Sequence, residues 1–180
     1  MRLTVSVRTK KAGPMLNRRN VLGVGAILAG LGFMFRPRLT DAAGQQQTFE
    51  ITKTEEEWRK LLTPEQFYVL RKHGTERAFT SPLDKDYRPG TYSCAGCDLP
   101  VFSSTTKFDS KTGWPSFYAP IENAIGTTTD RSFFMTRTEV HCRRCGGHLG
   151  HMFEDGPPPT GLRYCMNGVA MKFSPERAPS

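Results

Sequence analysis

The chain of 180 residues is long enough for one domain of ordinary size with a hydrophobic core of its own. Its formal net charge of +8 is concentrated at one end, because residues 1–43 carry eight Lys and Arg side chains and a single Asp. The rest of the chain has 17 basic and 16 acidic side chains, and this balance argues against nucleic acid as a partner.

Residues 1–43 have the three parts of an export signal, namely basic residues, an apolar run from Val21 to Phe35, and small residues after it. The run of 15 residues is shorter than the roughly 20 that a membrane span needs. Arg18 and Arg19 resemble the twin-arginine pair, although Asn precedes them instead of Ser or Thr. We expect twin-arginine export to a bacterial periplasm and no stable membrane span in the mature form. A general secretory signal or an uncleaved anchor is the alternative.

Two short helices are expected near the start of the mature chain, after a polar tether over residues 44–52. Thr54 and Glu57 have the spacing of a capping box, so a helix should begin there and run to Leu62. Thr63-Pro64-Glu65-Gln66 repeats this pattern with proline at the first helical position, and Gly74 should end the second helix as a left-handed cap. Both helices should lie on the outside of the domain.

From Tyr87 onward, aromatic and β-branched runs broken by Gly and Pro predict strands and turns. Burial of Phe133 and Phe134 is expected because the alternation around them is imperfect, and the three prolines of Gly156–Gly161 predict an irregular loop. The predicted strands are Gly90–Cys94, Val101–Ser104, Ser132–His141, Leu149–Phe153, Arg163–Met166 and Ala170–Phe173.

Four of the five cysteines form two Cys-x-x-Cys knuckles, Cys94/Cys97 and Cys142/Cys145. Two knuckles together supply four thiolates, which complete a closed tetrahedral site for structural Zn²⁺. Iron also accepts four thiolates, and two local disulfides or one redox dithiol are further alternatives. A closed site has no open coordination position, so any chemistry must take place elsewhere.

Cys165 is the one cysteine outside the knuckles. A lone cysteine in a strand is most often a small buried apolar side chain. A reactive thiol is the alternative, because Arg163 would project from the same face of the strand and would favour the thiolate.

Two further segments carry side chains capable of chemistry. His148 and His151 are three residues apart and suit metal ligation or proton transfer, although a buried structural histidine is equally compatible with the pattern. Trp114, in Gly113-Trp114-Pro115-Ser116-Phe117, is either a core plug or the wall of an apolar pocket.

Taken together, these segments closely resemble the peptide-methionine (R)-S-oxide reductases, one of two enzyme classes that each reduce one epimer of methionine sulfoxide. The resemblance spans about residues 53–174, leaving 175–180 as a tail. It implies a mainly β domain of two small antiparallel sheets with peripheral N-terminal helices. The matching segments are Gly113–Phe117, the four knuckle cysteines, Gly147–Phe153 and Arg163–Asn167.

The resemblance also implies roles for particular residues. Cys165 would be the nucleophile that attacks the sulfoxide sulfur, and Trp114 and Phe117 would bind the substrate. The residues expected to bind and polarise the sulfoxide oxygen, or to surround the nucleophile, are His148, His151, Asn167, Arg163 and Asp155.

One departure from the family pattern affects turnover. Many members have a second, resolving cysteine directly before the Gly-Trp-Pro-Ser-Phe segment, and Thr112 stands in that place here. A Cys165 sulfenic acid would then be reduced directly by an external thiol, such as a thioredoxin-like protein. The expected partners are proteins or peptides with methionine sulfoxide and this reductant, and the protein is expected to be a monomer.

Two rival functions belong to other classes. A zinc-ribbon binding module would explain the knuckles but would leave Trp114, His148, His151 and Cys165 without a role. A thiol–disulfide oxidoreductase would use one Cys-x-x-Cys pair and would hold no zinc.

Overall fold

The computed structural model describes residues 48–177, which form a mainly β domain with two antiparallel sheets and two short helices. The predicted fold class is therefore confirmed. The export signal and residues 44–47 of the tether lie outside the described residues. Among residues 48–177, no helix has the length and apolar character required to cross a membrane.

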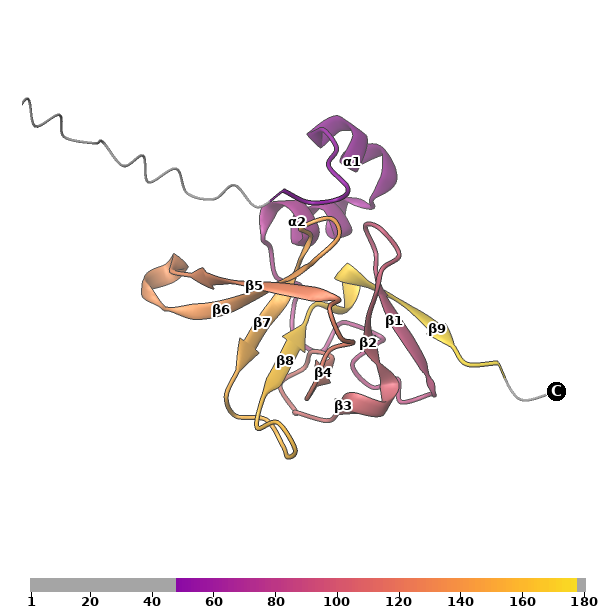
Figure 1. The fold of residues 1–180 in the computed structure, drawn as a ribbon, viewed down its shortest axis with the longest axis vertical. Helices are drawn as coiled ribbons and strands as arrows, with labels where there is room; N and C mark the ends of the chain where they lie inside the picture. The colour runs from indigo at the N-terminus through magenta and orange to yellow at the C-terminus, as the bar shows by residue number, and fades with distance from the viewer. Residues whose placement is uncertain (1–47, 178–180) are drawn as a thin grey trace, which may run out of the picture. The chain divides into compact units, whose positions relative to one another are not determined.

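The two sheets share no strand. The smaller one has the order β2-β1-β9 and the larger one the order β3-β4-β8-β7-β6-β5. Figure 1 shows them side by side, with both helices gathered at one end of the domain. The strands are β1 (Gly90–Cys94), β2 (Pro100–Ser103), β3 (Lys107–Phe108), β4 (Ser116–Phe117), β5 (Ile125–Asp130), β6 (Arg137–Cys142), β7 (His148–Phe153), β8 (Arg163–Met166) and β9 (Met171–Pro175).

Both predicted helix starts are confirmed. Helices α1 (Glu55–Leu61) and α2 (Pro64–Lys72) each begin with a complete capping box, at Thr54 and Thr63. Helix α2 ends one residue earlier than expected, because His73 and not Gly74 has the left-handed conformation, with φ 54°. A Cβ atom on Gly74 would lie 2.2 Å from the ring of Tyr68, so Gly74 is required there for close packing.

Most predicted strands are present within a residue or two, but the region before β6 differs. Residues Ser132–Phe134 form a 3₁₀ turn, and Phe134, with φ 59°, is fully exposed, so the predicted burial of this side chain is wrong. The side chain of Phe133 lies outside what the structure describes. Strand β5 was not predicted, because its Ile-Gly-Thr-Thr-Thr-Asp sequence has no apolar alternation and lies at a sheet edge.

The core joins helices and sheets. Val69 and Leu70 of α2 are buried, and this helix contacts β7 and the 3₁₀ turn Gly168–Ala170. Between the sheets, Phe102 of β2 stacks on Phe117 of β4 with ring centroids 4.4 Å apart. This packing fixes the position of β4, which lies next to the strand that carries Cys165.

Candidate active site

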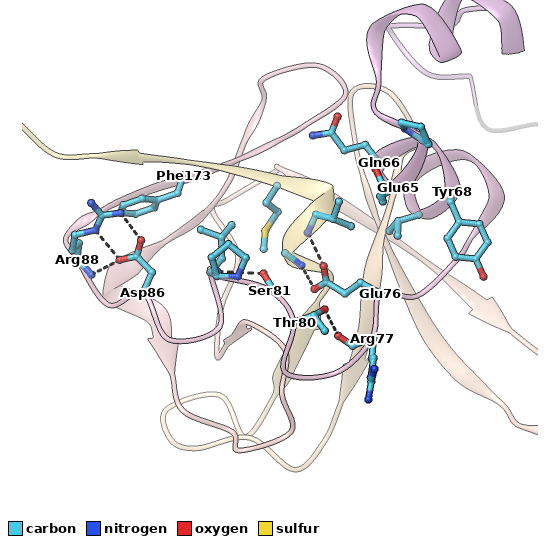
Figure 2. A pocket seen from close by; sticks show the side chains of 17 residues that line it. Glu65, Gln66, Tyr68, Glu76, Arg77, Thr80, Ser81, Asp86, Arg88 and Phe173 are labelled. Carbon is cyan, nitrogen blue, oxygen red and sulfur yellow. Dashed lines mark hydrogen bonds and ion pairs between the residues drawn. The ribbon is translucent and has the colours of Figure 1, made fainter.

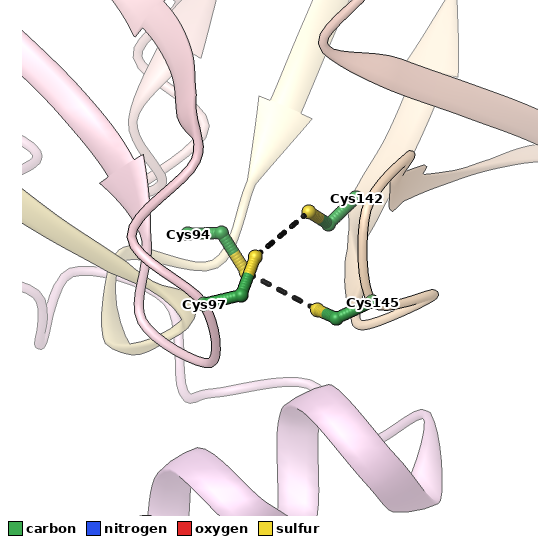
Figure 3. Close-up of side chains that lie close together, drawn as sticks. All are labelled: Cys94, Cys97, Cys142 and Cys145. Atoms are coloured by element: carbon green, nitrogen blue, oxygen red, sulfur yellow. Dashed lines mark hydrogen bonds between the residues drawn. The ribbon is translucent and has the colours of Figure 1, made fainter. Parts of the chain in front are cut away.

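The two cysteine knuckles meet as predicted and bring four thiols together (Figure 3). Cys94 and Cys145 have sulfur atoms 3.7 Å apart, and the sulfur atoms of Cys97 and Cys142 are 3.5 Å apart. Sulfur atoms bound to Zn²⁺ at about 2.3 Å in a tetrahedron are roughly 3.8 Å apart, so the cluster fits this ion. The four sulfur atoms form one cluster to which both knuckles contribute, and all four cysteines are free, which differs from two local disulfides.

Arg71 of α2 supports the cluster from outside. Its guanidinium donates hydrogen bonds to the carbonyl oxygen of Cys145 at 3.1 Å and approaches the Cys145 sulfur at 3.8 Å. The same guanidinium lies over the ring of Trp58, 4.5 Å from its centroid. Hydrogen bonding with Cys142 lowers the pKa of Cys97 to about 7, which favours the thiolate that a metal ion needs.

Strand register places Cys165 in a polar row that crosses the larger sheet. Cys165 of β8 lies opposite Ser116 of β4 on one side and His151 of β7 on the other. The row continues to Glu139 of β6 and Thr128 of β5. Directly opposite residues project from the same face of a sheet, so five polar side chains from five strands share one face.

A small cavity of about 120 Å³ adjoins the Cys165 end of this row. Trp114 and Phe153 supply aromatic surface, and His151 supplies a polar group. This combination of apolar wall and polar group suits a small ligand with an apolar part and one oxygen atom. The complete lining is Thr75, Trp114, Arg137, Gly150, His151, Phe153, Cys165 and Asn167.

The predicted thiolate at Cys165 is not favoured in the free site. Burial raises the pKa of this thiol, and hydrogen bonds from Thr112, Ser116 and Arg163 together with the charge of Arg163 only partly oppose the effect. Arg163 has a stronger partner, because its Nε and Nη2 each donate to a carboxylate oxygen of Asp155 at 2.8 Å. The resting state of Cys165 is therefore the neutral thiol.

Asp155 stands outside the cavity, and its side chain is 62% exposed. Its part in the site is to hold Arg163, whose guanidinium also lies over the ring of Phe153 at 4.4 Å. Phe153 lines the cavity, so this ion pair fixes one of its walls.

The two predicted histidines occupy different environments. His151 lines the cavity, and its Nε2 is 2.8 Å from Asp130, which also accepts from Arg137 at 2.7 Å. Burial lowers the pKa of His151, although Asp130 acts in the opposite direction. No sequence motif marks Asp130, because it ends an edge strand that was not predicted.

His148 does not line the Cys165 cavity, although its ring centroid is 5.3 Å from that of His151. It is almost fully buried, and its Nδ1 is 2.9 Å from Glu139 Oε1. Burial raises the pKa of Glu139, but hydrogen bonds from His141, His148 and Thr128 outweigh this and hold it well below its usual range. Any contact of His148 with a ligand in the cavity would pass through His151 or a water molecule.

Glu76 connects Trp114 to Asn167. Its carbonyl oxygen accepts from the Trp114 indole at 3.1 Å, and its N–H donates to Asn167 Oδ1 at 2.9 Å. Its carboxylate accepts from the backbone N–H groups of Gly168 and Val169, on the side that opens to a groove of about 1010 Å³ (Figure 2). No motif marks Glu76, because it lies 91 residues from Asn167 along the chain.

Asn167 has one free donor for a ligand. Its Oδ1 is used by Glu76, and its Nδ2 donates to the carbonyl oxygen of Leu149 at 3.1 Å. An amide nitrogen has two hydrogens, so one remains for the cavity that Asn167 lines.

Phe117 is placed differently from the expectation of substrate binding. It is fully buried against Phe102 and does not line the cavity. Successive residues along a strand point to opposite faces of the sheet, so Ser116 faces Cys165 while Phe117 enters the core. Phe117 therefore acts on the site only through packing.

Comparison with known proteins agrees with this site. The family model of the SelR domain matches residues 62–175. The chain belongs to this family. Among relatives, it is 60% identical to the peptide methionine sulfoxide reductase MsrB of Pseudomonas putida (strain W619), over 70% of this chain and 96% of that protein. It is 53% identical to the MsrB of Agrobacterium fabrum, over 70% and 94%.

A relative from a chloroplast is similar over a smaller share of its length. The peptide methionine sulfoxide reductase B1 of Arabidopsis thaliana is 56% identical over 67% of this chain and 60% of that protein. The matched SelR segment includes all four knuckle cysteines, Trp114, His151 and Cys165.

The metal cluster leads to a stability prediction. Replacing Cys142→Ser should release the metal and unfold much of the domain, because structural zinc sites contribute about 10–16 kcal/mol, as much as a whole domain's stability. Metal content by mass spectrometry and thermal melting by circular dichroism measure both effects. Cys165→Ser is the matched control and should keep its metal and melting temperature. A Cys142→Ser protein that melts like the wild type would contradict the structural role of the cluster.

Proposed function

We propose that this chain reduces the R epimer of methionine sulfoxide, free or within proteins, and so repairs oxidised proteins. As a member of the SelR family it is an oxidoreductase, and its relatives are named methionine sulfoxide reductases. The observation that carries the proposal is the position of Cys165 in a cavity lined by Trp114 and His151. The metal cluster stands apart from this cavity and has a structural role.

In the proposed reaction, the sulfur of Cys165 attacks the sulfoxide sulfur while the methyl group packs on Trp114. The attack forms a bond between the two sulfur atoms, and the sulfoxide oxygen takes up the thiol proton. The hydroxyl group then passes to Cys165 while the substrate's sulfur–oxygen bond and the new sulfur–sulfur bond break, which leaves a sulfenic acid on Cys165 and releases methionine. The oxygen must be polarised by hydrogen-bond donors, and His151 and the free hydrogen of Asn167 Nδ2 are available in the cavity. His151 Nε2 donates to Asp130 at 2.8 Å, so Nδ1 can donate to the sulfoxide oxygen only when the ring is protonated, a form that Asp130 favours.

The neutral resting state of Cys165 fits this scheme. A buried thiol is protected from unspecific oxidation, because the thiolate is the reactive form. A bound substrate supplies the oxygen that accepts the proton, so the thiolate forms only when it is needed. Thr112 and Ser116 can stabilise that thiolate by hydrogen bonds.

Regeneration uses an external thiol. The sulfenic acid of Cys165 reacts with one thiol to a mixed disulfide and water, and a second thiol then releases Cys165. The hydroxyl of Thr112 lies 3.8 Å from the Cys165 sulfur, where a resolving thiol would have to stand. The other four cysteines belong to the metal cluster.

The two rival functions have less support. A zinc-ribbon binding module gives no reason for a cysteine and a histidine side by side in a cavity. A dithiol oxidoreductase would have to use the cysteines of the cluster, where all four thiols lie within 4.8 Å of one another as one set of metal ligands.

The nucleophile can be tested directly. The Cys165→Ser variant should lose at least about 1,000-fold in reduction of (R)-methionine sulfoxide with dithiothreitol, because no other described thiol reaches the cavity. An epimer-resolved assay measures this, with the S epimer as the negative control for both proteins. Activity near the wild-type level would remove Cys165 from its role, and equal reduction of both epimers would refute the specificity.

The one-cysteine cycle predicts a trapped intermediate. Without reductant, the wild type should turn over once and leave a Cys165 sulfenic acid that dimedone labels. The Thr112→Cys variant should instead close a disulfide with Cys165, since the side-chain atoms at these positions are 3.8 Å apart, and should lose two hydrogens in intact mass. Thr112→Ser is the control and should behave as the wild type. A disulfide in the wild type with its metal retained would contradict this cycle.

We further propose that the protein acts as a monomer in the periplasm after twin-arginine export. Replacing Arg18→Lys and Arg19→Lys together should leave unprocessed precursor in the cytoplasm, because this route reads the arginine pair. Cell fractionation followed by immunoblotting measures the precursor. Normal processing when the twin-arginine translocase is blocked would assign the leader to the general secretory route.

A further inference from the structure

A second cluster of ligand side chains lies on the far side of the polar row from Cys165. It consists of His73, which caps α2, Glu139 of β6 and His148 of β7. These residues are separate from the four cysteines and line a hollow of about 540 Å³. The cavity role proposed for Cys165, Trp114 and His151 makes no use of His73.

The ligand atoms have the spacing of a metal site. Glu139 Oε1 is 2.9 Å from His148 Nδ1 and 3.6 Å from His73 Nδ1, and one ligand atom from each residue falls within 4.8 Å of the others. Two ligands bound at about 2.0–2.1 Å are roughly 2.9 Å apart at a right angle and roughly 3.4 Å apart in a tetrahedron. The two distances from Glu139 match these values, and the third pair, His73 and His148, lies within 4.8 Å and closes further around an ion.

His148 has a nitrogen atom that the described residues leave unused. It is 1% exposed, yet its Nε2 has no hydrogen-bond partner among residues 48–177. A buried polar atom without a partner costs about 1–3 kcal/mol, and its retention needs a reason. If Nδ1 binds a metal ion, the ring proton resides on Nε2. If Nδ1 keeps its proton for Glu139, Nε2 is free as a ligand.

The surroundings allow a cation to enter. His73 is 65% exposed, so the hollow reaches solvent on that side. Three cationic residues line the hollow: Lys72 is paired with Glu55 at 2.6 Å, Arg137 is paired with Asp130 at 2.7 Å, and Arg131 is exposed. Glu139 brings a negative charge that its low pKa preserves at neutral pH.

We propose that His73, Glu139 and His148 form a second metal site, for Zn²⁺ or another divalent ion that prefers imidazole, and that its occupation inhibits the reductase. Two imidazoles and a carboxylate are a known ligand set of Zn²⁺, and water completes the coordination. A bound metal ion would replace the hydrogen bond between His148 and Glu139. Both residues are neighbours of His151, which lines the Cys165 cavity. The inhibition rests on the proposed function, whereas the binding does not.

The binding test uses the full chain with its cysteine cluster loaded, in a Cys165→Ser background so that this thiol supplies no ligand. Equilibrium dialysis against Zn²⁺ with metal analysis should find a second zinc ion per chain. Adding His73→Asn should lower the affinity for this second zinc ion by tenfold or more. Asparagine tolerates the left-handed conformation of residue 73 but is a poor metal ligand. Lys72→Ala, which removes a neighbouring side chain of the hollow, is the matched control and should bind as before.

The activity test uses chains that retain Cys165. Zinc in excess of the cysteine cluster should inhibit the wild type reversibly, and His73→Asn should need at least tenfold more zinc for the same inhibition while keeping its zinc-free activity. A single zinc ion per chain in the Cys165→Ser background, or equal binding with and without His73, would overturn the site. Binding without inhibition would overturn the regulatory part. A wild type inactive on methionine sulfoxide without added zinc would refute the proposed function and leave the binding result standing.

Discussion

The four cysteines join the two sheets, because Cys94 ends β1 of the smaller sheet while Cys142 ends β6 of the larger one. The smaller sheet has only three short strands, and neither sheet is covered by long helices. A metal ion bound by these four thiols would fix the angle between the sheets in addition to the small apolar core. The position of β8 and Cys165 depends on this angle through the packing of Phe102 on Phe117.

The candidate site follows from strand register. Five polar side chains face the same side of the larger sheet only because β4, β8, β7, β6 and β5 pair with one particular alignment. A slip of one residue would turn Cys165 away from the cavity and Tyr164 toward it. The sheet is therefore the device that places a thiol, a histidine and a carboxylate side by side.

The charged side chains near Cys165 are mostly paired with one another. Arg163 is bound by Asp155, and His151 and Arg137 are bound by Asp130, so little positive field remains to ionise the buried thiol. Burial therefore remains the dominant influence on the Cys165 thiol and raises its pKa. The two networks around Glu76 and Glu139 serve the same purpose, since each carboxylate fixes several groups from distant segments.

Local sequence determined the features that act over a few residues: the capping boxes at Thr54 and Thr63, the proline-rich loop and the two knuckles. The family motifs also indicated Cys165, Trp114 and His151. Only the tertiary structure decided that Phe117 belongs to the core, that Phe134 is exposed and that His148 lies behind the cavity. It alone revealed Glu76, Asp130 and Glu139, because the contacts that place them in the site join segments up to 93 residues apart and form only through strand register and packing.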